Sequence, residues 1–223
     1  RGRSYSGQFG RPPFPFRVFA ALSGRKAWGE YRERGAPESV GDGHLTVGAL
    51  KLWLDGALGS RGAALHAPYC DDPANTGLVL VPPEEVDRLT CDAVSRGFHV
   101  WVHAIGDRAN ALVLDVFERV LAAGGPRPRL RVEHAQILAP ADIPRFARLG
   151  VVPSMQPTHC TSDMRWAEER LGAERLAGAY AWRSMLDSGA YIAGGSDFPA
   201  EHANPFHGLH AAVTRPPRAG ADP

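Results

Sequence analysis

The sequence has 223 residues, of which 44% are apolar and 22% are charged, a composition typical of a folded globular chain rather than a disordered one. Its 25 basic and 24 acidic residues nearly cancel, so no excess of positive charge favours nucleic-acid binding. Three cysteines cannot form a disulfide framework, and they include no C-x-x-C pair, which excludes a zinc ribbon and a thioredoxin-like motif.

The two ends of the chain carry no helix or strand pattern. The first residue is Arg1 rather than Met, no signal-peptide segment follows, and no apolar run is long enough to span a membrane. We therefore expect a cytoplasmic chain, either a fragment or a processed product. A single domain is expected over residues 16–215, between a loop or disordered piece at 1–15 and a disordered tail at 216–223.

Short apolar strands alternate with amphipathic helices along the interior of the chain. In order, the pattern predicts strands over 16–22 and 47–54, a helix over 83–96, a strand over 98–103, a helix over 108–123, a strand over 130–133, a helix over 140–149, a strand over 151–155, a helix over 180–188, a strand over 191–193 and a helix over 208–214. This alternation predicts a parallel sheet with right-handed crossovers.

The expected fold class is therefore α/β, either a doubly wound sheet or a (β/α)8 barrel. No G-x-G-x-x-G follows the first predicted strand, so a dinucleotide site of the Rossmann type has no support. No G-x-x-x-x-G-K-[ST] phosphate loop occurs either.

Polar side chains gather where the predicted strands end. His103, Glu133, His134 and Asp197 lie at or just beyond strand ends, which meet at one face of a parallel barrel. Lys51 lies inside an apolar strand, where an unpaired buried charge is costly, so it must face a polar cavity or be neutralised. Imidazole nitrogen and carboxylate oxygen suit zinc, so the two histidines, Asp197 and Lys51 together predict a metal site.

Simpler roles compete for each of these residues. One strand-end histidine is more often hydrogen-bonded than metal-bound, and Lys51 could be an ordinary edge-strand lysine. His99 is expected to face away from the barrel interior and to be structural. Surface or outer positions are expected for His66, His159, His202, His207 and His210, and unreactive thiols for Cys70, Cys91 and Cys160.

Five segments together resemble the family-3 amidohydrolases, the YtcJ-like metal-dependent hydrolases of the amidohydrolase superfamily. They are KLWLDGALGSR at 51–61, VHAIGDR at 102–108, RVEH at 131–134, SMQPT at 154–158 and GSDFP at 195–199, and they follow in the family's order. The resemblance implies a distorted (β/α)8 barrel that holds one or two divalent metals, usually zinc.

The resemblance also implies roles for single residues. Lys51 matches a strand-four lysine that is often carbamylated and bridges two metals, and His103 and His134 match ligands on strands five and six. Asp197 matches the strand-eight acid, which binds metal and shuttles a proton. Residues in or beside these segments that are expected to face substrate or to support the ligands are Asp55, Ser60, Arg61, Asp107, Glu133, Gln136 and Gln156.

The sequence departs from the family in one respect. The family carries an H-x-H pair on its first strand, and no H-x-H occurs here. The strand predicted over 16–22 then corresponds to the family's third. We therefore expect an internal fragment, a partial TIM-like barrel of about six strands, without the family's β-sandwich and with two open sheet edges.

The resemblance implies a hydrolase of carbon–nitrogen bonds other than peptide bonds, such as N-acyl or N-formyl amides of small molecules. Metal-activated water would attack the carbonyl, with Asp197 moving the proton. Two alternatives stay open: a non-catalytic truncated remnant that cannot complete its metal site, and a binding module that uses the barrel mouth. No nucleic-acid or membrane partner is expected, and homo-oligomer formation is left open.

Overall fold

The structure is a computed structural model, and it describes residues 16–125 and 127–215. The loop or disordered piece predicted at 1–15 and the disordered tail predicted at 216–223 lie outside the described residues. The described part forms one sheet in which six parallel strands are arranged in the order β1-β3-β4-β5-β6-β7. The strands are β1 Val18–Ser23, β3 Leu45–Trp53, β4 His99–Ala104, β5 Leu130–His134, β6 Val152–Met155 and β7 Ala193–Gly194.

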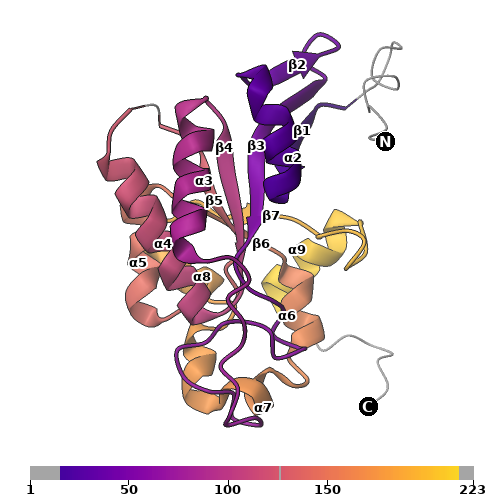
Figure 1. The fold of residues 1–223 in the computed structure, drawn as a ribbon. Coiled ribbons are helices and arrows are strands. Elements are labelled where there is room, and N and C mark those ends of the chain that lie inside the picture. Colours follow the sequence, from indigo (N-terminus) through magenta and orange to yellow (C-terminus); the bar gives the residue numbers. More distant parts are fainter. Residues whose placement is uncertain (1–15, 126, 216–223) are drawn as a thin grey trace.

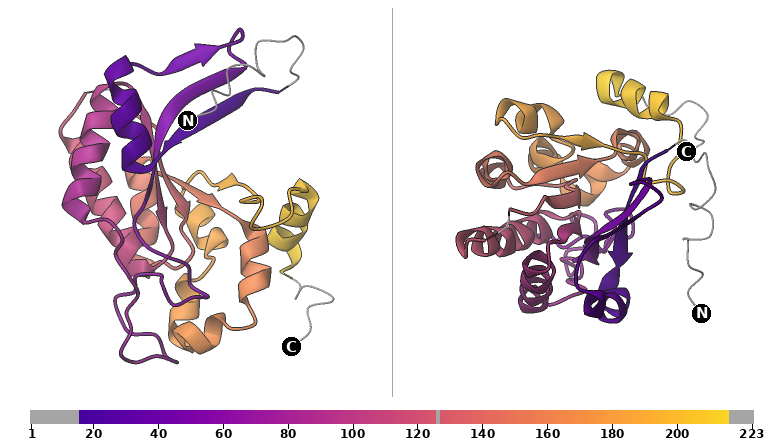
Figure 2. Two further views of the ribbon diagram at one scale, coloured as in Figure 1. Left: turned by 45° about the vertical axis from the view of Figure 1, so that its right-hand side comes forward. Right: turned by 90° about the horizontal axis from the view of Figure 1, so that it is seen from above.

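The sheet curls into a half-barrel with β1 and β7 at its two edges (Figure 2). A short strand, β2 Glu38–Val40, pairs antiparallel with β3 at the top of Figure 1. The expected α/β class and partial TIM-like barrel are therefore confirmed. Residues 16–125 and 127–215 contain no second sheet that could form a β-sandwich.

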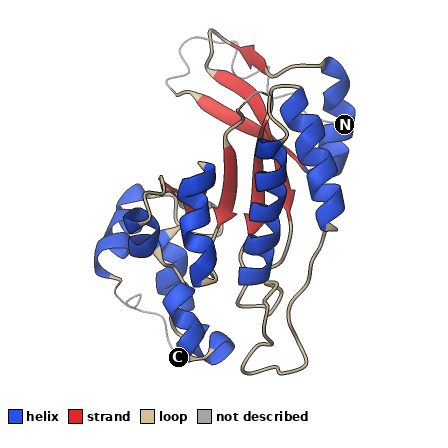
Figure 3. Ribbon diagram, turned by 90° about the vertical axis from the view of Figure 1, so that its left-hand side faces the viewer, coloured by secondary structure: helices blue, strands red, loops and turns tan. Residues whose placement is uncertain are grey.

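Helices cover the convex face of this sheet (Figures 1 and 3). Neighbouring helices there pack in the order α3 Pro83–Ser95, α4 Asp107–Ala122, α5 Ile143–Leu149 and α8 Trp182–Asp187. Elsewhere, α2 Gly24–Tyr31 packs on β1 and β3, and α6 Pro157–Asp163 packs against α9 Pro205–Thr214. A short helix, α7 Ala167–Leu171, follows α6, and 3-10 turns cover Arg32–Arg34, Pro140–Asp142 and Ala173–Gly178. Within the described ranges, none of these helices has the length and apolar character needed to cross a bilayer.

Most predicted elements occur within a few residues of their predicted positions. The predicted helix at 140–149 divides into a 3-10 turn and α5. The last helix begins earlier than predicted, at Pro205, because the Asn204 side chain accepts a hydrogen bond from the Phe206 N–H and caps it. The strand predicted over 191–193 is shorter and begins later, since β7 covers only Ala193–Gly194, and Tyr191 before it is 86% exposed. The α-helices and strands that the sequence pattern did not predict are α2, β2, α6 and α7.

Side-chain alternation in β4 divides the apolar core from the concave face. Val100, Val102 and Ala104 are fully buried against the helices. His99 and His103 lie on the opposite side, because residues four apart in a strand point the same way. His99 therefore faces the barrel interior, contrary to expectation. Its ring stacks on Phe19 at 5.5 Å, and its Nδ1 accepts a hydrogen bond from the Arg129 N–H.

Candidate metal centre

A cavity of about 560 Å³ opens at the carboxyl ends of the parallel strands. All four residues predicted to bind metal line it, and so do several predicted supporting residues. The lining residues that matter here are Lys51, His103, Glu133, His134, Gln136, Gln156, His159 and Asp197. Four other predicted residues, Asp55, Ser60, Arg61 and Asp107, do not line it.

His134 reaches this cavity because the chain turns sharply at the end of β5. Strand alternation puts Arg131 and Glu133 on the concave face, so His134 would otherwise face the helices. Instead, His134 and Ala135 have φ values of 77° and 45°, in the left-handed region. That conformation costs about 1–2 kcal/mol per residue other than glycine, and here it aims the imidazole at the cavity.

A hydrogen bond fixes which nitrogen of His134 faces the cavity. Its Nδ1 lies 2.8 Å from the Gln156 Oε1, while the Gln156 Nε2 donates to the Ser154 carbonyl. Because the amide oxygen can only accept, Nδ1 carries the proton and Nε2 keeps a lone pair. Burial, together with the nearby His103, lowers the pKa of His134 to about 3, so the ring is neutral at pH 7.

Asp55 lies behind His103. The Nε2 of His103 is 3.4 Å from the Asp55 Oδ1 and is buried without a hydrogen-bond partner within the described residues. The Asp55 carboxylate is 1% exposed and accepts three backbone N–H bonds, from Ala64, Ile105 and Gly106, at 2.8–3.0 Å. The rings of His103 and His134 lie 4.5 Å apart. A buried carboxylate behind an imidazole is the usual support of a metal-binding histidine.

His159 joins His134 and Asp197 in one cluster. Each of the three offers a ligand atom, and these atoms lie within 4.8 Å of one another. The His159 Nε2 is 3.7 Å from the Asp197 Oδ2, and the His159 ring stacks on His134 at 5.7 Å. His159 thus lines the cavity itself, whereas a surface or outer position was expected. The sequence analysis did not predict α6, and the one signal that could have located it is Pro157, since proline favours the first position of a helix.

Lys51 is on the concave face, at the wall of the same cavity. Its Nζ donates to the Leu52 carbonyl at 3.3 Å and lies 4.3 Å from the centre of the Trp53 ring. Burial lowers its pKa to about 8, against the opposing effect of the Glu133 and Asp197 charges. A neutral amine is therefore accessible near neutral pH, which carbamate formation requires.

Glu133 is already paired. Both of its carboxylate oxygens accept hydrogen bonds from Arg131, at 2.8 and 3.0 Å. The same guanidinium donates to the Ser154 hydroxyl and lies 4.3 Å from the centre of the Trp101 ring. Glu133 thus contributes a neutralised pair to the wall of the cavity.

The remaining predicted residues hold the long β3–α3 loop in place. Arg61 forms a two-bonded ion pair with Asp71. Asp107, at the start of α4, accepts the N–H of His66. The Ser60 hydroxyl donates to the Ala57 carbonyl. These residues position the loop beside the cavity.

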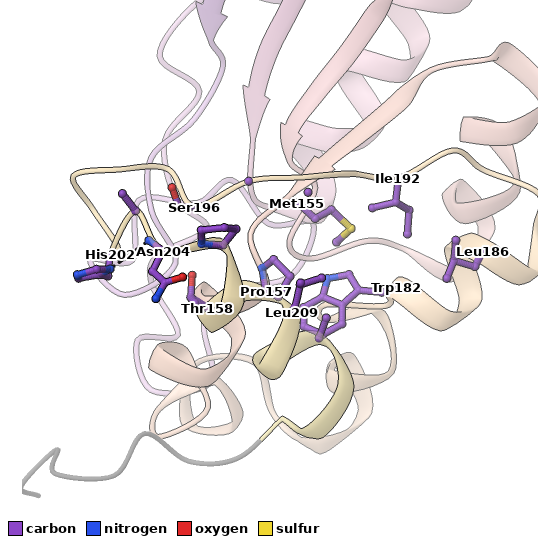
Figure 4. A pocket seen from close by; sticks show the side chains of 16 residues that line it. Met155, Pro157, Thr158, Trp182, Leu186, Ile192, Ser196, His202, Asn204 and Leu209 are labelled. Carbon is purple, nitrogen blue, oxygen red and sulfur yellow. Dashed lines mark hydrogen bonds between the residues drawn. The ribbon is translucent and has the colours of Figure 1, made fainter. Parts of the chain in front are cut away.

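A second cavity, of about 520 Å³, lies between α6, α8, β7 and α9 and is mostly apolar (Figure 4). Trp182 and Leu186 lie at one end, and His202 and Asn204 at the other. Among the described residues that line it, His202 is the titratable one. The lining of this second cavity includes neither an acidic residue nor a cluster of ligand atoms. The first cavity is therefore the candidate catalytic site.

The model of the Amidohydrolase family matches residues 13–222. This chain belongs to the amidohydrolase family. It is 42% identical to the Protein LONG AFTER FAR-RED 3 of Arabidopsis thaliana (78% of this chain, 30% of that protein) and 39% identical to the putative amidohydrolase YtcJ of Bacillus subtilis strain 168 (80% and 33%). It is 29% identical to the N-substituted formamide deformylase of Arthrobacter pascens (79% and 32%). The chain thus spans about a third of these curated relatives.

A solved structure shares the fold. The chain superposes on an uncharacterized metal-dependent hydrolase from Pyrococcus horikoshii OT3 with a TM-score of 0.80 and 36% identity, covering 89% of this chain and 39% of that one. The family and the barrel that the sequence motifs predict are therefore confirmed.

Proposed function

We propose that the protein carrying this chain is a metal-dependent hydrolase of carbon–nitrogen bonds other than peptide bonds, acting on N-acyl or N-formyl amines. One observation carries this proposal: the ligand atoms of His134, His159 and Asp197 converge at the carboxyl ends of parallel strands. Barrel enzymes keep their reactive groups at that face. The similarity to an N-substituted formamide deformylase supports the N-formyl class.

The residues present fit a divalent cation, and we assign zinc. Two imidazole nitrogens and a carboxylate oxygen are zinc donors. His134 is neutral, with Nε2 available, and His103 is supported by a buried carboxylate while its ring lies next to His134. Lys51, once carbamylated, would add anionic oxygens from the same wall.

The chain's own residues can direct the proton. When bound, the metal polarises the substrate carbonyl and lowers the pKa of water. The Asp197 side chain is 45% exposed and takes the proton from the attacking water. The water oxygen bonds to the carbonyl carbon, the carbon–nitrogen bond breaks, and Asp197 returns the proton to the leaving nitrogen. His159, 3.7 Å away, orients the Asp197 carboxylate.

Hydrolysis of N-butylformamide and N-butylacetamide tests this function. We expect turnover to disappear after chelation and to return with zinc. Asp197→Asn should lower kcat by about 100-fold or more while zinc stays bound, because the proton carrier is lost. Asp187→Asn, at an exposed pair on α8, should leave the rate unchanged. Turnover that survives chelation, or an unaffected Asp197→Asn variant, would contradict the proposal. Bound zinc without turnover of any amide would favour the non-catalytic remnant.

A further inference from the structure

The candidate catalytic cavity has a second acidic wall, centred on Asp163. This residue ends α6 and lines the cavity together with Gln136 and Trp166. The Tyr180 hydroxyl donates a hydrogen bond to the Asp163 Oδ2, and the Gln136 Nε2 donates to the same oxygen at 2.9 Å. Gln136 also donates to the Tyr180 hydroxyl, which completes a three-membered network.

This network leaves one oxygen of the Asp163 carboxylate available to a ligand. Both hydrogen bonds fall on Oδ2, and within the described residues Oδ1 accepts none. No lysine or arginine in residues 16–125 and 127–215 forms an ion pair with Asp163. Its neighbours include a second acid, Glu201, and burial raises the pKa of Asp163. A partly buried carboxylate held only by neutral donors gains most from a cationic ligand.

Asp163 lies next to the proposed metal centre. His159 and Asp163 are four residues apart in α6, so they share one face of the helix, with Cβ atoms about 6 Å apart. A substrate whose amide lies at His134 and Asp197 would therefore place a group a few bonds away against Asp163.

An apolar wall lies beside this carboxylate. The Trp166 indole packs so closely on Gly59 that a Cβ at Gly59 would be 3.0 Å from the ring. Leu58 lines the same part of the cavity. An alkyl chain between the amide and a terminal charge would have apolar contacts along its length.

We propose that Asp163 selects amide substrates that carry a protonated amine a few bonds from the scissile bond, and that it disfavours substrates with a carboxylate there. This substrate class rests on the proposed function for its choice of an amide. Asp163 acts on binding, through its charge, and takes no part in proton transfer.

Three probes with the same three-methylene spacer differ in the charge of their end group: N-acetyl-1,3-diaminopropane is cationic, N-butylacetamide is neutral, and 4-acetamidobutyrate is anionic. Their affinities are measured by calorimetry on metal-free protein, where no turnover occurs. We expect the cation to bind at least tenfold more tightly than the neutral probe, and the anion to bind most weakly. Asp163→Asn should bring the cation-to-neutral ratio close to one, whereas Asp163→Glu should keep it.

Asp197→Asn is the matched control, because it removes another carboxylate of the same cavity, one that lies 3.7 Å from the His159 Nε2. The ratio should persist in that variant. Equal affinity for cation and neutral probe in the unmodified protein would overturn the proposal, and this result does not depend on any variant folding. So would a ratio that Asp163→Asn leaves intact or that Asp197→Asn abolishes. Failure of the proposed function is a separate outcome: zinc-loaded protein would hydrolyse no amide, whatever the binding ratio.

Discussion

Two of the residues proposed to bind metal have unusual backbone conformations. His134 and Asp197 have φ values of 77° and 57°. Histidine and aspartate adopt this region more readily than most residues, but it still costs free energy. The sequence could show that a histidine and an acid stand at strand ends, but not that a left-handed turn re-aims His134 against strand alternation.

The Asp55 carboxylate behind His103 is predicted to support zinc binding. Asp55→Asn removes the charge that faces the His103 Nε2, so zinc affinity should fall by about 10- to 100-fold. The variant should also lose about 2 kcal/mol of stability, because three N–H donors lose an ionised acceptor. Competition with a chelator and urea unfolding measure the two effects.

Asp107→Asn is the control for that experiment. Asp107 is also a buried carboxylate that accepts backbone N–H groups in the same region, but it does not line the cavity. It should lose stability and keep its zinc affinity. Equal losses of zinc affinity in the two variants would show that Asp55 acts through the fold alone.

The buried imidazole of His134 predicts a pH dependence for metal-free protein. Its pKa falls from 6.5 to about 3 on folding, because burial disfavours the charged ring. The unfolded state therefore binds a proton that the folded state excludes. The contribution of His134 to the free energy of unfolding is therefore complete above pH 6.5. It is lost as pH falls toward 3, by up to about 1.4 kcal/mol per pH unit.

Urea unfolding at pH 7 and pH 5 measures this slope. His134→Gln should reduce the difference in stability between the two pH values by about 2 kcal/mol, since one proton no longer distinguishes the two states. His207→Gln, on the exposed surface of α9, should leave the difference unchanged. A His134→Gln variant with the same slope as the unmodified protein would refute the assignment.

Among the elements, the long β3–α3 loop depends on close backbone contacts. The Ala64 N–H donates to Asp55, and the Ala64 carbonyl accepts from the N–H groups of Arg108 and Ala109 at the start of α4. Gly106 makes this approach possible, because a Cβ there would lie 2.0 Å from the Ala64 oxygen. The loop and α4 thus fix Asp55 behind His103.

Gly106→Ala should therefore destabilise the protein by about 2–3 kcal/mol, since backbone atoms must move to admit the methyl group. Gly29→Ala is its counterpart, in an exposed helical position of α2 with nothing within 4 Å, and should stabilise by about 0.5–1 kcal/mol. Thermal unfolding compares the two, and a Gly106→Ala variant as stable as the unmodified protein would contradict this account.

The elements also show what sequence patterns can predict. The long amphipathic helices α3 and α4 lie within one residue of their predicted bounds, because several apolar side chains repeat at helical spacing. The short helix α6 has the sequence PTHCTSD, which contains no apolar stripe. Its two cavity residues, His159 and Asp163, were therefore not predicted to be functional.

For the whole molecule, alternation of strands and helices was enough to predict the parallel order of the sheet and the end where the polar residues meet. Which side chains line the cavity at that end depends on contacts between distant segments, such as the Asp163–Tyr180 and Gln136–Asp163 hydrogen bonds. No local pattern encodes such contacts, so the candidate metal cluster was only partly predicted. The strand pattern pointed to Lys51, inside a strand, and to His103, His134 and Asp197, at strand ends, whereas His159 was found from the structure.

Zinc content per chain tests the central claim most directly, that strand-end residues of this half-barrel form one divalent-metal site. The purified protein is loaded with zinc, dialysed and measured by elemental analysis, alongside His134→Ala and the exposed control His210→Ala on α9. The unmodified protein and His210→Ala should retain about one zinc or more per chain, and His134→Ala less than about a tenth of that amount. Equal zinc in His134→Ala and the unmodified protein, or none in any of the three, would contradict the account.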